Sequence, residues 1–250
     1  MLKYGKKDAI IALCVFIVLV ALSLVDEVLT TNFEAQATIF QFTSRIIIIV
    51  VVFSIVLLKK QGLASIGFHK DKLRSMLKFG IIITLILSAF GIVPGLIHGW
   101  EFNSFGVVIP ILFTTIIMAA GEDIFFVGYL QTRLYGLFKK DVPAIFAGAV
   151  LFALAHVPGL LIGFHTGWIT MWIIWLIGHT LMVLIFRRHF SIIPVIIVHS
   201  LANFFSTGGL WCEYSFDYNE DWSGIAIILI FLVLLILEIV RYNRAKKEQV

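Results

Sequence analysis

The chain has 250 residues, of which 60% are hydrophobic and only 14% are charged, and its formal net charge is +4. Soluble domains are about 45–50% apolar and about 25% charged, so this composition excludes a soluble globular protein and predicts a polytopic membrane protein. The small positive charge carries no nucleic-acid signal, because the basic residues lie at the edges of apolar runs. The two cysteines, Cys14 and Cys212, lie in unlike surroundings, so we expect no disulfide between them.

Apolar windows of about 20 residues predict eight membrane-spanning segments. Continuous apolar runs of this length are typical of helices and not of barrel strands, so we expect an all-α transmembrane bundle forming one integral membrane domain over residues 1–250. The predicted spans are 9–25, 39–58, 77–97, 107–134, 142–163, 167–186, 191–208 and 222–242. The first could be read as a signal peptide, but it is long enough to span, so we expect a retained anchor.

The connections between these spans alternate in charge. Connections 59–76, 135–141 and 187–190 contain lysine and arginine, whereas 26–38, 98–106 and 209–221 contain neither and carry acidic residues. By the positive-inside rule, both termini are predicted to be cytoplasmic. We therefore expect a multi-pass protein of the cell membrane, embedded in the lipid bilayer.

Four polar residues lie deep within the predicted spans: Glu122, His156, His199 and Asn203. Counting helix rise from the inner span ends places all four roughly 12–21 Å into the membrane. His199 and Asn203 are four residues apart and so share a helix face. Ionisable side chains at such depth cost about 2.5–3.5 kcal/mol each, so their retention indicates a function. We expect the four side chains to converge on one hydrated pocket.

A carboxylate, two imidazoles and an amide in such a pocket can hydrolyse an amide bond. Glu122 can take a proton from water, with His156 sharing that water and helping to protonate the leaving amine. His199 and Asn203 can donate hydrogen bonds to the oxyanion. Alternatively, Glu122, His156 and His199 can hold a divalent metal such as zinc, with one position open for water. The sequence leaves open whether the cofactor is a metal or none.

Three motifs in this order resemble those of a known family. Glu122-Asp123-Ile124-Phe125-Phe126-Val127, then Phe152 to His156, then His199 to Asn203 resemble three motifs of the CPBP family. The family motifs are Glu-Glu-x-x-x-Arg, Phe-x-x-x-His and His-x-x-x-Asn or Asp. That family comprises CAAX prenyl endopeptidases together with bacteriocin-processing, immunity and abortive-infection proteins. The resemblance covers about residues 60–208, which implies a catalytic core there, with residues 1–59 and 209–250 as peripheral transmembrane helices.

The resemblance implies an intramembrane endopeptidase that cleaves a peptide or a membrane-anchored protein segment. Glu122 and His156 would then activate the water, and His199 and Asn203 would form the oxyanion site. Asp123, which stands where the family has a second glutamate, would support the site.

Position 127 departs from the family pattern, because Val127 replaces the motif arginine and removes the cation expected beside the carboxylates. Arg45 and Arg133 are the nearest candidates to replace it. We expect Arg45 to snorkel near the outer surface and Arg133 to be an anchor at the inner edge.

Two other functions agree with the sequence. A non-catalytic relative that acts in peptide immunity or as a scaffold is favoured by Val127 and Asp123. A proton-coupled transporter would also use buried acids and imidazoles, but the chain lacks the paired broken helices of two symmetric halves. We expect His179 to be structural. Pro158 and Pro194 either open kinks beside the two motif histidines or only shape the packing.

Overall fold

The computed structural model describes residues 4–32, 34–69, 73–98, 100–161, 168–206, 209–210 and 222–247. Helices account for most of this part of the chain, which confirms the all-α prediction. Cys212 and most of the predicted outer connection 209–221 lie outside the described residues. The elements are α1 (Lys6–Asn32), α2 (Glu34–Leu58), η1 (Leu63–Ile66), α3 (Leu73–His98), α4 (Phe105–Asp123), η2 (Ile124–Leu130), α5 (Gln131–Phe138), α6 (Asp141–Ala155), α7 (Val157–Leu161), α8 (Trp168–His189), α9 (Ile193–Ser206) and α10 (Trp222–Lys247).

Each of the predicted spans coincides with a helix or with consecutive helices. Within the described residues, five helical stretches are long and apolar enough to cross a membrane, and α9 contains a shorter apolar stretch, Ile193–Phe205. The five are Lys6–Leu29, Ile39–Leu58, Phe105–Phe138, Asp141–Gly159 and Thr170–His189. The chain is therefore a membrane-integral helical protein, whereas the count of eight spans and the cytoplasmic termini stay predictions.

The first connection differs from its prediction. Residues 26–38 were expected to be an outer connection, but α1 continues to Asn32 and α2 begins at Glu34. Asp26 is thus a helical residue, and it is buried in the bundle. It lies near the side chains of Gln41 and Arg45, whose polar groups compensate for the loss of water around its carboxyl group.

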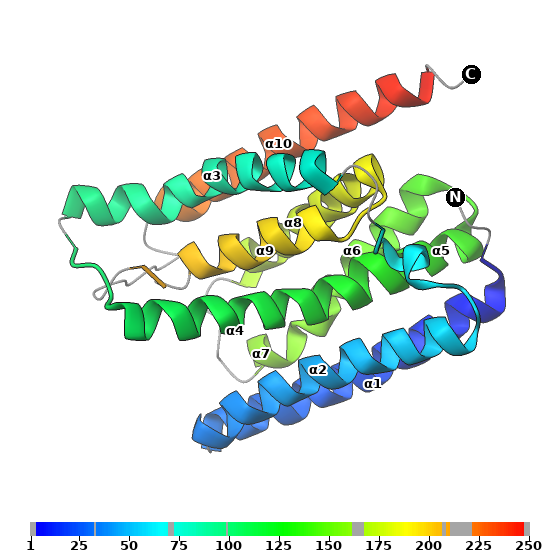
Figure 1. Cartoon of the computed structure of the whole chain (residues 1–250), viewed down its shortest axis with the longest axis horizontal. Coiled ribbons are helices and arrows are strands. Elements are labelled where there is room, and N and C mark those ends of the chain that lie inside the picture. The colour runs from blue at the N-terminus through cyan, green and yellow to red at the C-terminus, as the bar shows by residue number, and fades with distance from the viewer. Residues whose placement is uncertain are drawn as a thin grey trace.

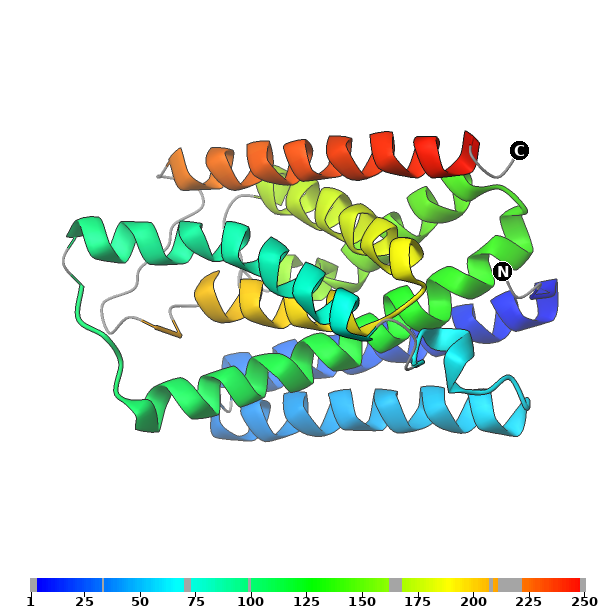
Figure 2. The ribbon, with the colours of Figure 1, turned by 45° about the horizontal axis from the view of Figure 1, so that its top comes forward.

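The helices run roughly along the long axis of the molecule (Figures 1 and 2). The α1–α2 hairpin packs against α4, which in turn packs on α9, and α9 packs on α3. On the other side, α6 packs on α8 and α8 on α10. The start of α1, the end of α2 and the end of α10 lie at one end of the bundle (Figure 1). Ion pairs at this end include Lys59–Asp8, Arg187–Asp141 and Arg188–Glu238.

The centre of the core is η2, a π-helical segment that joins α4 to α5 in one continuous helix. All seven of its residues are buried. Gly128 allows η1 to approach closely, since a Cβ there would lie 2.8 Å from the carbonyl oxygen of Ile66. Short π-helical stretches within α-helices occur often at functional sites. Here the π-helical segment begins directly after Glu122 and Asp123.

Candidate active site

Glu122 and Asp123 form the last two positions of α4, and their carboxylates face different helices. Successive residues of a helix point about 100° apart, so one side chain reaches α2 and the other reaches α9. Oε1 of Glu122 lies 3.0 Å from Nη2 of Arg45, and Oδ1 of Asp123 lies 3.0 Å from Nδ1 of His199. The two motif acids therefore have separate partners.

Arg45 was expected near the outer surface, and this expectation is wrong. It lies about 13 residues from the inner end of α2 at Leu58, roughly 20 Å along the axis, which is close to the depth of Glu122. Its side chain is only 13% exposed and forms an ion pair with Glu122, which is 14% exposed. The same count of helix rise, applied to Arg45, would have found this match in the sequence.

Gly121 explains how Arg45 comes so close to α4. A Cβ at position 121 would lie 2.9 Å from Cβ and 3.1 Å from Cδ of Arg45, closer than side chains pack. The missing side chain thus leaves the space that the arginine stem occupies. Val127, at the position of the family arginine, is fully buried in the apolar core. The cation beside Glu122 therefore comes from another helix.

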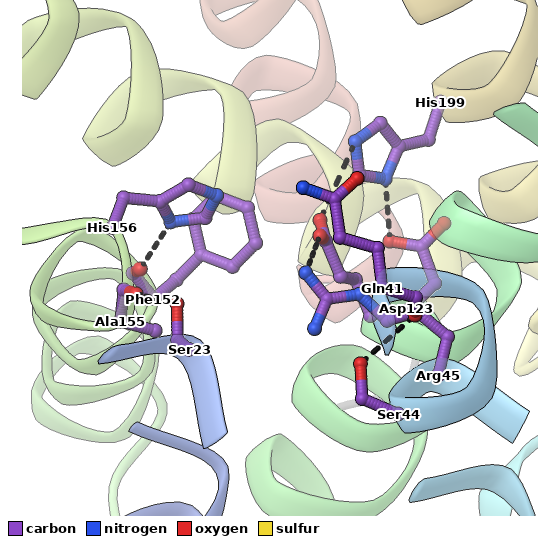
Figure 3. A network of polar contacts seen from close by, with 10 residues as sticks. Ser23, Gln41, Ser44, Arg45, Asp123, Phe152, Ala155, His156 and His199 are labelled. Atoms are coloured by element: carbon purple, nitrogen blue, oxygen red, sulfur yellow. Dashed lines mark hydrogen bonds and ion pairs between the residues drawn. The ribbon is translucent and has the colours of Figure 1, made fainter. Parts of the chain in front are cut away.

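His199 of α9 lies between the two carboxylates. Its Nδ1 donates a hydrogen bond to Asp123, and its Nε2 lies 4.0 Å from Oε2 of Glu122. Figure 3 shows the ring above the side chains of Asp123 and Arg45. One imidazole thus connects the two acids, each through a different ring nitrogen.

His156 approaches from the other side of the site, at the break between α6 and α7. Its Nδ1 donates to the carbonyl oxygen of Phe152 at 2.9 Å, so in the neutral ring Nε2 carries the lone pair. The ring lies between Phe152 and Trp175, with centroids 4.7 Å from each. In Figure 3 it lies opposite the Arg45–His199 group. Among the described contacts none joins it directly to Glu122, although the two lie within electrostatic range.

Asn203 lies on α9 one helical turn after His199 and is half-buried. Pro194 falls in the first turn of α9, where a missing N–H costs no helical hydrogen bond. Pro158 follows the break at His156, so of the two prolines only this one accompanies an interruption beside a motif histidine.

Arg133 lies at the end of the bundle where it was expected, beside Tyr4 and Gln61, but it does not anchor at a surface. It is fully buried, and its guanidinium lies 4.2 Å from the ring centroid of Tyr4 and 4.3 Å from that of Tyr129. It donates to Oε1 of Gln61 and to Oγ of Ser65. Aromatic faces and neutral oxygens replace water around this cation, so it does not need to reach the surface. None of the contacts described for it involves a motif residue.

His179 of α8 is buried and stacks on Phe152, with ring centroids 4.9 Å apart. Because Phe152 also contacts the ring of His156, His179 supports the wall of the site. This position agrees with a structural role.

The metal alternative requires Glu122, His156 and His199 to converge as ligands. Within the described part of the chain, no three His, Cys, Asp or Glu side chains are arranged to hold a metal ion. The Nδ1 hydrogen bonds of the two histidines leave Nε2 as the nitrogen that a metal would use. Oε1 of Glu122, however, is already paired with the guanidinium of Arg45, so this carboxylate does not fit a metal in the present arrangement.

Comparison with known proteins bears on the middle of the chain. A family model described as Type II CAAX prenyl endopeptidase Rce1-like matches residues 104–205. No curated protein matches the chain. The matched segment contains Glu122, Asp123, His156, His199 and Asn203, but not Arg45. The match confirms the resemblance that the three motifs indicated: residues 104–205 are similar to the Rce1-like endopeptidases of the CPBP family.

Proposed function

We propose that the protein is an intramembrane endopeptidase of the cell membrane that cleaves a peptide or a membrane-anchored protein segment. The proposal is supported mainly by one observation: Glu122, Asp123 and His199 are in contact at mid-bundle, within the segment that matches a CAAX prenyl endopeptidase family. That family is one of proteases, and its substrates are membrane-associated peptides.

In the proposed reaction, Glu122 is the base. Its carboxylate accepts a proton from a water molecule while the water oxygen attacks the scissile carbonyl carbon. His156 accepts a hydrogen bond from the same water through the Nε2 lone pair, because its Nδ1–H is committed to Phe152. The proton on Glu122 then passes to the leaving amine as the carbon–nitrogen bond breaks. The products are a free amine and a carboxylic acid, which keeps the second proton of the water until it ionises.

His199 and Asn203 stabilise the oxyanion in this scheme. With Asp123 on Nδ1 and Glu122 near Nε2, the His199 ring is held between two negative charges, which favours the imidazolium with an N–H on both nitrogens. The Nε2–H and the amide of Asn203, one turn further along α9, then donate to the developing negative charge. Asp123 acts through His199 and does not touch the substrate.

The test uses the purified protein in liposomes and an internally quenched peptide that ends in a farnesylated Cys-aliphatic-aliphatic-X sequence. We expect cleavage by the wild type and a loss of at least about 100-fold in kcat for Glu122→Gln and His156→Phe. Cys14→Ser is the matched control, since Cys14 is exposed on the outside of the bundle, and it should cleave normally. Full cleavage by Glu122→Gln would contradict the proposal.

The alternative, a non-catalytic relative acting in peptide immunity or as a scaffold, is favoured by Val127, which removes the motif cation. Arg45 provides a cation at Glu122, however, so the loss of the motif arginine is only weak evidence against catalysis. The alternative predicts that a variant with both Glu122→Gln and His156→Phe still protects cells or binds peptide as the wild type does. Loss of these properties in the double variant would favour the peptidase.

A further inference from the structure

We propose that the α1–α2 hairpin completes the active site, with Arg45 as the positioning residue of Glu122. The inference rests on the proposed peptidase function. Residues 1–59 were expected to be peripheral, and they lie outside the family-matched segment. The hairpin nevertheless contacts both sides of the site, which gives it a role beyond anchoring the core in lipid.

Arg45 contacts one oxygen of the proposed base and leaves the other available. The contact joins Nη2 to Oε1 of Glu122 at 3.0 Å, whereas Oε2 lies on the side of His199, 4.0 Å from its Nε2. A cation bound to one oxygen fixes the rotation of the carboxylate and keeps it ionised. Arg45 thereby directs Oε2 toward the side where His199 would bind the oxyanion.

Arg45 is itself held in place by its surroundings. Its stem fills the space left by Gly121, and the buried carboxyl group of Asp26 on α1 lies within electrostatic reach of its guanidinium. Because Asp26, Arg45 and Glu122 come from three helices, this charge network connects α1, α2 and α4. Such a network restrains the arginine more than a single surface ion pair would.

The hairpin also contacts the His156 side of the site. Oγ of Ser23 on α1 donates to the carbonyl oxygen of Ala155 at 3.3 Å, at the end of α6. Ala155 directly precedes His156, so α1 contacts the backbone at the helix break where the imidazole is placed (Figure 3). One hairpin therefore touches the supports of both proposed water-activating groups.

The experiment compares Arg45→Gln and Arg45→Lys with Arg188→Gln. Arg188 forms an interhelical pair with Glu238 at 3.1 Å, of similar burial but distant from the motif residues, and is the matched control. With the farnesylated quenched peptide, we expect Arg45→Gln to lower kcat by about 100-fold with KM nearly unchanged, since a misdirected base slows chemistry but not binding. Arg45→Lys should recover at least about tenfold of that loss because the charge returns. Arg188→Gln should stay within about twofold of the wild type.

A purely structural role for Arg45 gives a different result. The loss in kcat would then disappear when rates are divided by the folded fraction, and lysine would not restore it selectively. Either result, or a wild-type kcat for Arg45→Gln, overturns the inference even when Glu122→Gln is inactive and the peptidase proposal stands.

If the wild type does not cleave the peptide, the proposed function fails. Thermal unfolding then tests whether Arg45 and Glu122 are energetically coupled. We expect Arg45→Gln and Glu122→Gln to be non-additive, with the double variant less destabilised than the two single losses combined. Additive losses would show that the two side chains are not coupled and would overturn the inference.

Discussion

Asp123 and His199 are separated by 76 positions in the sequence, yet Oδ1 of the first accepts a hydrogen bond from Nδ1 of the second at 3.0 Å. The Asp123 side chain is only 3% exposed, and its Oδ2 has no hydrogen-bond partner among the described residues. His199 is therefore its main polar partner. The second acid of the first motif orients an imidazole of the third motif, which is a different task from that proposed for Glu122.

Replacing Asp123 with Asn tests this relationship. The substitution keeps the shape but removes the negative charge that stabilises an imidazolium at His199, so the oxyanion loses a charged donor. We expect kcat to fall by about 100-fold in the peptide-cleavage assay. Asp123→Glu, which restores the family residue and keeps the charge, should retain most of the activity. Wild-type kcat for Asp123→Asn would show that the hydrogen bond has no catalytic consequence.

Gly121→Ala tests the packing that admits Arg45. The added methyl group would lie 2.9 Å from Cβ of Arg45, so α2 has to shift and the guanidinium moves away from Glu122. A displacement of a fraction of an ångström at the base should lower kcat by about tenfold. Gly106→Ala, in the first turn of the same helix, meets its nearest neighbour at 3.8 Å and serves as the control. Equal rates for the two variants would contradict the packing argument.

Val127→Arg restores the arginine of the family motif in the sequence, but we expect it to destabilise this protein. Val127 is fully buried among apolar side chains, and Glu122 already has a cation. A second, unpaired charge in the core should reduce the free energy of unfolding by about 3 kcal/mol or more. Val142→Arg is the control because Val142 is 78% exposed near the basic end of the bundle. Thermal unfolding in detergent measures both, and a Val127→Arg variant as stable as the control would refute this expectation.

Arg133→Leu tests whether the second buried arginine contributes to stability without contributing to catalysis. The change removes two cation–π contacts and leaves Gln61 and Ser65 without their donor, so the free energy of unfolding should fall by about 2–4 kcal/mol. Because no contact described for Arg133 reaches a motif residue, kcat per folded molecule should stay unchanged. Arg244→Leu, at an exposed position of α10, is the stability control. A selective loss of kcat in Arg133→Leu would assign it a site role.

The sequence by itself determined the helices and predicted the depth of the polar residues. In lipid every backbone group must be bonded internally, so long apolar runs become helices, and the constant helical rise converts position into depth. The layer that holds Glu122 and His199 could therefore be predicted from residue counts. The α1 boundary could not, because Asp26 is buried among polar neighbours that belong to another helix.

Only the tertiary structure decided which polar group meets which. Arg45 and Glu122 are 77 positions apart, and they pair because Gly121 lets α2 and α4 approach at that level. Arg133 stays buried because Tyr4, from a segment far away in the sequence, covers its guanidinium. The rise per residue is the same in every helix, so it can be applied to the sequence directly. Which faces of two helices meet depends instead on packing between distant segments. For this reason the sequence could predict the depth of the cation but not its partner.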